Sequence, residues 1–401
     1  MKFAYFGIPH TGGTYSVYRS LRKGLAEHGV DVSWLGVGPK AQAAMLDPRW
    51  QSDLSHGAVI AGDEENEREQ ARRLNRHLVE AGFDGVFVNV LSGRVATNAI
   101  RFLDPAVKRV MIVHTITLAT YAAARAIRDH VHATVGVSPR IRDDLIHQYG
   151  FSADRTQAIA NAVDLARFQA ATRLPRQDGP LRLLSLGRII NSDKGIFWLP
   201  EILERLPADV GQLTIAGDGP DLAELKRRCA RFGERVRFIG RVDAEQVPKV
   251  LASHDVFLFP SRFEGLPLSL VEAMAAGCVP VASRIKGVTE TVVRSGENGL
   301  LFPIGDVQAA AQAIEQLHRD PDGLSRMSTA ARESVIGRFD LSTMAQAYFS
   351  ILETLVSKPT RIAAPYPIEH WRYPRGLKPG FRTYLPTDLK NWLRLLRERL
   401  A

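Results

Sequence analysis

Cysteine is scarce in this sequence of 401 residues, which contains only Cys229 and Cys278. Two thiols cannot form a disulfide framework, and they show no metal-ligand spacing, so we expect both to be buried as small apolar side chains. The chain also lacks any apolar run of the roughly 18 to 20 residues that a membrane-spanning helix needs. The first apolar segment meets Gly7 and Pro9 too soon for a signal peptide. These absences predict a cytoplasmic protein.

The net positive charge is small in the body of the chain and concentrated at its end. Residues 357–401 hold ten Lys and Arg against three Asp and Glu, whereas the whole chain has 52 against 43. A body this close to neutral argues against a nucleic-acid-binding protein, whose folded domain would carry a basic face. The 45% hydrophobic and 24% charged residues are ordinary for a globular chain long enough for two domains.

Short apolar runs alternate with helix-like segments in two successive series. The first series predicts strands at 2–6, 31–35, 85–90, 109–113 and 133–137. The second predicts strands at 181–186, 212–216, 235–239, 255–259, 279–282 and 299–302, with helices at 220–231 and 268–276. Such alternation is typical of doubly wound α/β domains with parallel sheets.

A polar, Pro- and Gly-bearing stretch at 170–180 separates the two series and has the composition of a linker. We therefore predict Rossmann-like domains at 1–169 and 181–339, a helix at 340–356 that crosses back to the first domain, and a basic tail at 357–401. The expected fold class is α/β with two facing domains. Ligands would bind in the cleft between them, because the carboxyl ends of the strands would open into it.

The most informative segment is 261–281, SRFEGLPLSLVEAMAAGCVPV. Glu264 follows a predicted strand, and Glu272 lies eight residues later, in the early turns of a predicted helix. Between them Gly265 and Pro267 allow the backbone to come close to a ligand. This block resembles the signature of the retaining glycosyltransferases of family 4, also called group 1, which have two Rossmann-like domains in the arrangement known as GT-B.

The resemblance extends over residues 1 to about 356. Its further motifs are Leu186-Gly187-Arg188 with Lys194-Gly195, Ala216–Pro220, Gly240–Val242, Asn161–Asp164, Gly287 with Glu290, and, in the first domain, Gly12-Gly13 and His114. Two positions depart from the family pattern, because Ala162 and Lys286 stand where glycine is common.

The resemblance also implies a set of site residues. A departing diphosphate gathers negative charge, which fixed cations and backbone amides stabilise, and Arg188 and Lys194 would supply the cations. Glu264 would hold the donor sugar, Glu272 the ribose hydroxyls, and His114 would face the reacting sugar. The implied catalytic residues are thus His114, Arg188, Lys194 and Glu264, and the implied donor contacts are Gly12, Gly13, Gly187, Gly217, Val242, Gly265, Leu266, Pro267, Leu268 and Glu272.

The implied reaction is transfer of a sugar from a UDP- or GDP-linked donor to a glycan or glycolipid acceptor, with retention at the anomeric carbon. Bacterial lipopolysaccharide, exopolysaccharide and other envelope glycans are the expected products. We expect no cofactor and no metal. The only Asp-x-Asp pattern, Asp320-Pro-Asp322, fits a helix cap better than a metal site.

The tail ends in a pattern that favours an amphipathic helix at 387–400. Leu389, Trp392, Leu393, Leu396 and Leu400 share one face, and Lys390, Arg394 and Arg397 lie off it. This helix would either contact an anionic membrane peripherally or pack on the first domain. Aromatic residues precede it, at Trp371, Tyr373, Phe381 and Tyr384.

Other functions remain open at this point. A nucleotide-sugar 2-epimerase would share the architecture but would need a different acid–base set. A non-catalytic partner subunit would have lost site residues that are intact here. A dinucleotide-dependent oxidoreductase is disfavoured, because the segment from Gly7 to Gly13 contains no G-x-G-x-x-G pattern.

Overall fold

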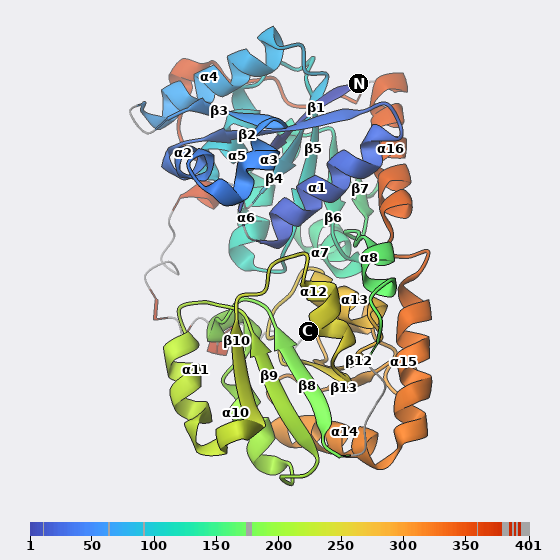
Figure 1. Cartoon of the computed structure of the whole chain (residues 1–401). Helices are drawn as coiled ribbons and strands as arrows, with labels where there is room; N and C mark the ends of the chain where they lie inside the picture. Colours follow the sequence, from blue (N-terminus) through green and yellow to red (C-terminus); the bar gives the residue numbers. More distant parts are fainter. Residues whose placement is uncertain are drawn as a thin grey trace. The chain divides into compact units, whose positions relative to one another are not determined.

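The computed structural model describes residues 1–10, 12–62, 65–90, 93–173, 179–358, 360–378, 385–386, 389 and 392–393. Contacts divide the chain into two compact units: unit 1 comprises 1–162 with 341–383, and unit 2 comprises 163–340 with 384–401. Each unit is built on one parallel β-sheet with associated helices (Figure 1).

The sheet of unit 1 has the strand order β3-β2-β1-β4-β5-β6-β7. All of β4 and β6 and most of β5 are buried, as expected for a parallel sheet covered on both faces. Its strands are β1 Lys2–Phe6, β2 Asp31–Val37, β3 Gly57–Ala61, β4 Gly85–Asn89, β5 Lys108–Val113, β6 Ala133–Gly136 and β7 Thr156–Ala158. Its helices are α1 Gly13–Ala26, α2 Pro39–Met45, α3 Gln51–Leu54, α4 Glu67–Glu80, α5 Arg94–Ala99, α6 Leu118–Ile127, α7 Pro139–Tyr149 and α16 Leu341–Ser357.

The sheet of unit 2 has the order β10-β9-β8-β11-β12-β13. Alternate residues of its strands, such as Leu183, Ile215 and Val281, enter one core shared with the helices. The strands are β8 Leu181–Leu186, β9 Gly211–Ala216, β10 Val236–Gly240, β11 Val256–Phe259, β12 Val279–Ser283 and β13 Leu300–Phe302. The helices are α8 Leu165–Gln169, α9 Asn191–Lys194, α10 Trp198–Arg205, α11 Leu222–Cys229, α12 Val247–Ala252, α13 Leu268–Ala275, α14 Val307–Arg319 and α15 Pro321–Val335.

These two sheets confirm the predicted fold class of two Rossmann-like α/β domains. The eleven predicted strands all form, with ends that differ by at most two residues. The sequence did not predict β3 and β7. Strand β3 is a short apolar run, GAVIA, most of it half-buried at the sheet edge, whereas β7 has three residues, two of them polar, and leaves no apolar run.

The chain passes from unit 1 to unit 2 at 162–163 and returns at 340–341. Helix α8 contacts α12 and α13, so residues 163–169 belong with unit 2 rather than with the first domain. Helix α16 packs on α1, where a Cβ at Gly24 would lie 2.7 Å from the Cβ of Ala345. A glycine is therefore needed at this close helix contact.

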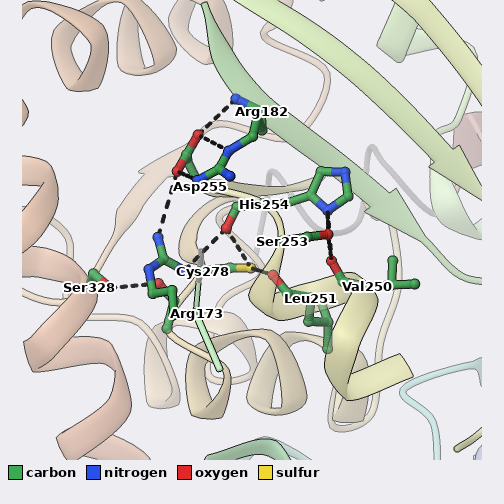
Figure 2. Close-up of polar contacts among 10 residues, drawn as sticks. Arg173, Arg182, Val250, Leu251, Ser253, His254, Asp255, Cys278 and Ser328 are labelled. Atoms are coloured by element: carbon green, nitrogen blue, oxygen red, sulfur yellow. Dashed lines mark hydrogen bonds and ion pairs between the residues drawn. The ribbon is translucent and has the colours of Figure 1, made fainter. Parts of the chain in front are cut away.

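A buried ion pair joins the start of β11 to the start of β8 (Figure 2). The side chain of Asp255, 3% exposed, accepts hydrogen bonds from Arg182 at 2.7 and 3.0 Å. Burial raises the pKa of Asp255, but the bonds from Arg182 outweigh this effect and hold the pKa below its usual range. Arg173 approaches Asp255 to 3.9 Å and donates to the carbonyl of His254 at 3.1 Å. The stretch expected to link the domains is thus anchored to unit 2 at residue 173.

Both cysteines are buried and free, as predicted. Burial raises the pKa of Cys229 to about 11 and that of Cys278 to about 12, so both thiols stay protonated at neutral pH. The thiol of Cys278 donates a hydrogen bond to the carbonyl oxygen of Leu251, and the distance from Sγ to that oxygen is 3.0 Å (Figure 2).

Residues 360–378 pack on unit 1. The amide of Tyr366 donates to the carbonyl of Arg101 at 2.9 Å, and the ring of Trp371 lies 5.0 Å from that of Phe102. A Cβ at Gly376 would fall 2.0 Å from the carbonyl oxygen of Ala122 on α6. This part of the tail is therefore a structural layer of the first unit.

The predicted amphipathic helix at 387–400, together with Phe381 and Tyr384, falls almost entirely outside the described residues. Trp392, one of the few described there, is 58% exposed. A role for this helix at a membrane stays a prediction. Among the described parts of the chain, no helix combines the length and the apolar character that a bilayer crossing demands.

Candidate active site

Unit 2 contains a topological switch point between β8 and β11. These strands are neighbours at the centre of the sheet, but the chain runs from β8 outward through β9 and β10, and from β11 outward in the opposite direction through β12 and β13. The loops that follow β8 and β11 therefore diverge at their carboxyl ends. In open α/β sheets this crevice is where ligands bind.

The loop after β8 carries two of the predicted cations. Arg188 is exposed, and its side chain has no partner among the described residues. Lys194 is the last residue of the single-turn helix α9. Gly195 follows it with a φ of 60°, and a Cβ there would lie 2.2 Å from the carbonyl oxygen of Pro260. Glycine thus lets the turn after β8 approach the chain that leaves β11.

Lys194 and Glu264 meet across the switch point. The Nζ of Lys194 donates to Oε1 of Glu264 at 2.5 Å, and their side chains are 27% and 10% exposed. An ammonium has three N–H donors, so this contact leaves two for another acceptor. The pair therefore joins the cation predicted for the diphosphate to the acid predicted for the donor sugar.

Unpaired backbone amides lie directly after Glu264. Helix α13 has no side-chain cap at its start, and Pro267 precedes its first residue, Leu268. The amides of Gly265, Leu266, Leu268 and Ser269 donate to no acceptor within the described parts of the chain. Together with the positive end of the helix dipole, these amides favour an anionic group.

Glu272 lies one turn further along α13. Its side chain is half-buried and has no hydrogen bond or ion pair with any described residue. Burial raises the pKa of Glu272 to about 7, although Arg167 opposes the shift. A carboxyl kept in place without a partner of its own is suited to accept hydrogen bonds from hydroxyl groups.

Two glycines predicted as donor contacts have a packing role as well. A Cβ at Gly217 would lie 1.8 Å from the carbonyl oxygen of Gly187, and the amide of Gly217 donates to the carbonyl of Gly240 at 2.7 Å. These glycines let the backbones of the turns after β8, β9 and β10 pack closely against one another. Val242, predicted to meet the base, is half-buried and follows the last of these turns.

Unit 1 has a corresponding switch point between β1 and β4. Gly12 and Gly13 follow β1 and begin α1. The amide of Gly12 already donates to the carbonyl of His10 at 3.0 Å. The amides of Gly13 and Thr14 have no partner within the described residues.

His114 directly follows β5 and is 7% exposed. Its Nε2 is buried and has no hydrogen-bond partner among the described residues. Burial lowers the pKa of His114 to about 4, so the imidazole is neutral near pH 7. The group can take part in hydrogen bonding but adds no positive charge at this edge of the sheet.

One supporting residue was not singled out from the sequence. The Nε of Arg262 donates to the carbonyl of Asn191 at 3.1 Å, and its guanidinium lies 3.7 Å from the ring centre of Trp198. The amide of Arg262 donates to the carbonyl of Asp193 at 2.8 Å. Arg262 therefore fastens the α9 turn that carries Lys194. Its place inside the 261–281 block is the only signal in the sequence.

Asp320 caps α15 by accepting from the amide of Gly323 at 2.8 Å, as predicted for the Asp-x-Asp pattern. Where the structure describes the chain, it contains no group of three or more His, Cys, Asp or Glu side chains that could hold a metal ion.

Two family models match the chain. The model described as Glycosyltransferase Family 4 matches residues 11–167, and the one described as Glycosyl transferases group 1 matches residues 180–320. Together the two matches span well over half of the chain and include most of both sheets.

Curated relatives align over about half of the chain. A glycogen synthase of Mycobacterium tuberculosis is 32% identical over 216 residues, which are 52% of this chain and 51% of that protein. A phosphatidyl-myo-inositol mannosyltransferase of the same species is 36% identical, over 51% of this chain and 55% of its own. A lipopolysaccharide core biosynthesis glycosyltransferase of Rhizobium meliloti is 32% identical, over 56% and 63%. The chain thus spans about half the length of the curated relatives it matches.

Solved structures share the whole architecture. The Anabaena protein HepE, crystallised with UDP and glucose, superposes with a TM-score of 0.73 over 88% of this chain and 100% of its own. The two sequences are 18% identical, so the likeness concerns the fold.

Proposed function

Because this chain belongs to the family 4 glycosyltransferases, we propose that it transfers a sugar from a UDP- or GDP-linked donor to a glycan or glycolipid acceptor. The observation that carries the proposal is the contact between Lys194 and Glu264 at the switch point of unit 2. Arg188 is in the same loop after β8 as Lys194, and the unpaired amides at the start of α13 follow Glu264. Cations and amides at the carboxyl ends of neighbouring strands are suited to stabilise a departing diphosphate.

Each residue of this set has a distinct part in the proposed reaction. Arg188 and the two remaining N–H donors of Lys194 would bind the diphosphate oxygens, and Glu264 would hold the donor sugar. Glu272 would accept from the ribose hydroxyls, because its carboxyl has no other partner in the described chain. The protein would need no metal for this step, since its own cations neutralise the leaving group.

We propose retention at the anomeric carbon. The acceptor oxygen forms a bond to that carbon on the face that the diphosphate leaves, through an oxocarbenium-like transition state. The carbon–oxygen bond to the diphosphate breaks, and the acceptor proton passes to a diphosphate oxygen. No protein nucleophile is assigned. Unit 1 offers the neutral imidazole of His114 and the amides of Gly13 and Thr14 for contacts with substrate.

The acceptor is proposed to be an envelope glycan or glycolipid. Two of the relatives are described as a lipopolysaccharide core glycosyltransferase and a phosphatidyl-myo-inositol mannosyltransferase, so lipid-linked acceptors are used among similar proteins. The predicted amphipathic helix at 387–400 would suit such acceptors by holding the enzyme peripherally at a membrane.

The test is an assay of purified protein with a panel of UDP- and GDP-sugars. Ligand-induced thermal shifts identify the donor, and release of UDP or GDP with acceptor lipid extracts reports transfer. Product NMR gives the anomeric configuration. Donor without acceptor is the discriminating control: conversion to another nucleotide sugar would identify an epimerase instead. Absence of donor binding and of transfer with every donor would refute the proposal.

A further inference from the structure

A pocket of about 550 Å³ lies in unit 1 at the amino-terminal ends of β6 and β7. Its walls come from the start of these strands, from the last turns of α16 and from the segment that follows α16. A smaller pocket of about 140 Å³ shares His132, Ala133 and Arg155 with it. The carboxyl ends of the strands, which carry Gly13 and His114, are at the opposite edge of the sheet. This pocket is therefore separate from the proposed donor site.

Positive charge predominates around the pocket. Arg155, Lys358 and Arg361 line it, and the one carboxylate in its lining is Asp154, which already accepts a hydrogen bond from Ser152. Arg155 is held in place by its bond from Nη1 to the carbonyl of Arg361 at 3.3 Å. The side chains of Lys358 and Arg361 are exposed. Three cations facing one carboxylate leave an uncompensated positive field, which favours an anion.

A buried histidine adds a fixed hydrogen-bond donor. His132 lines the pocket but is only 3% exposed. Its Nδ1 accepts from the backbone amide of Arg109 at 3.1 Å, so in the neutral ring the proton is on Nε2. Burial, with the nearby charges of Arg109, Lys108 and Arg155, lowers the pKa of His132 to about 4. Its Nε2–H has no acceptor among the described residues.

We propose that this pocket binds a phosphoryl group, carried either by a small soluble phosphate ester or by a phospholipid headgroup. Arg155, Lys358 and Arg361 supply charge-assisted donors to its oxygens, and His132, which lines the pocket, supplies a neutral donor. Ile351 and Leu355 of α16 give an apolar wall for the rest of the ligand. The volume falls in the range of small-ligand sites. The sequence motifs of the family include none of these residues.

The direct test follows His132 by NMR in the full-length protein labelled with ¹³C-histidine, and His132→Gln assigns the signal. Inorganic phosphate is titrated in the presence of saturating UDP or GDP, whichever the thermal-shift assay identifies, so that the proposed donor site is already occupied. We expect a saturable shift of the His132 signal. Lys358→Glu and Arg361→Glu should weaken the apparent affinity at least about tenfold, because each removes a charge-assisted donor. Arg68→Glu, an exposed charge reversal on α4, should leave it unchanged.

Two further arms distinguish the sources of the phosphoryl group. Glycerol 3-phosphate that shifts the His132 signal at lower concentration than phosphate identifies a soluble ester. Flotation with phosphatidylglycerol vesicles that is lost in Lys358→Glu and Arg361→Glu, with no flotation on phosphatidylcholine, identifies a lipid headgroup. An unmoved His132 signal, combined with the same flotation for the pocket variants and Arg68→Glu, would overturn the proposal.

Discussion

The Nζ of Lys194 lies 2.5 Å from Oε1 of Glu264, although 70 positions separate the two residues in the sequence. This contact joins the loops after β8 and β11, where the proposed diphosphate would leave. We expect Lys194→Ala and Arg188→Ala each to lower the turnover of glycosyl transfer on the order of 100-fold, because each removes a donor that stabilises developing charge. Initial rates at saturating donor measure the effect.

The matched control is Lys249→Ala, an exposed lysine on α12, which should leave turnover unchanged. Because Lys194 and Glu264 touch, the double variant Lys194→Ala/Glu264→Gln should lose less than the sum of the single losses. Near-normal turnover in both Arg188→Ala and Lys194→Ala would contradict the diphosphate assignment.

A second prediction concerns Gly217. Its φ of 141° is one that L side chains rarely adopt, and a Cβ there would meet the carbonyl oxygen of Gly187 at 1.8 Å. We expect Gly217→Ala to lower the free energy of unfolding by about 3 kcal/mol, because a backbone clash adds to the conformational strain. Urea unfolding followed by circular dichroism measures the change.

Gly296 provides a control that separates the effect of backbone strain from that of a steric clash. Its φ is 87°, but nothing lies within 4 Å of a Cβ built there. Gly296→Ala should therefore lower the free energy of unfolding by only about 1 kcal/mol, because it adds backbone strain without a clash. Equal losses in the two variants would show that the contact between the turns is not responsible.

The raised pKa of Glu272 predicts how stability depends on pH. The pKa of Glu272 is about 7 in the folded protein against an ordinary value of 4.5, so the folded state binds the proton more tightly. The contribution of the Glu272 carboxyl to stability is then largest below about pH 4.5 and is lost as the pH rises through about 7. Glu272→Gln removes this loss and should raise Tm by roughly 2 to 4 °C at pH 8, with a much smaller gain at pH 5.

Differential scanning calorimetry at both pH values gives the comparison. Glu245→Gln, an exposed change in the same unit, should not alter the pH dependence. A Tm gain for Glu272→Gln of the same size at pH 5 and pH 8 would mean that the Glu272 carboxyl is not desolvated in the folded protein.

The two tryptophans of the tail should behave differently. Trp371 packs against Phe102 with ring centres 5.0 Å apart, whereas Trp392 is 58% exposed. Trp371→Ala should lower the free energy of unfolding by about 2 kcal/mol, because it removes a large packed side chain. Trp392→Ala should leave stability unchanged.

Trp392→Ala also tests the predicted amphipathic helix. If 387–400 binds anionic membranes, this variant and a deletion of 387–401 should both reduce flotation with phosphatidylglycerol vesicles, whereas Trp371→Ala should not. Flotation that survives the deletion would argue that the helix packs on protein.

The parts of the fold that were predicted share one physical feature. Strands such as β4, β11 and β12 are buried on both faces, so they appear as apolar runs bounded by glycine, proline or polar residues. Strand β7, with the sequence TQA, lacks that contrast. The passage between units was expected near 170–180, but Arg173 already contacts unit 2, and composition alone cannot show such a contact.

The residues of the candidate site also fall into two groups, those that the sequence predicted and those that only the structure shows. The 261–281 block predicted Glu264 and Glu272, because its pattern resembles a family signature, and their contacts with a ligand stay a prediction. The support that Arg262 gives to the α9 turn depends on residues brought together only by folding. The pocket around His132 also depends on folding, because its lining residues come from segments about 200 positions apart in the sequence.

The chain passes from unit 1 to unit 2 and later returns to unit 1, and this path has a consequence for biosynthesis. Residues 163–340 of unit 2 form one continuous segment inserted in unit 1, and unit 1 needs α16 to cover α1. During translation the ribosome therefore delivers residues 163–340 before it delivers the last helix of unit 1. Until α16 is synthesised, the part of unit 1 that has already left the ribosome exposes an apolar surface. A chaperone would be of most use during that interval.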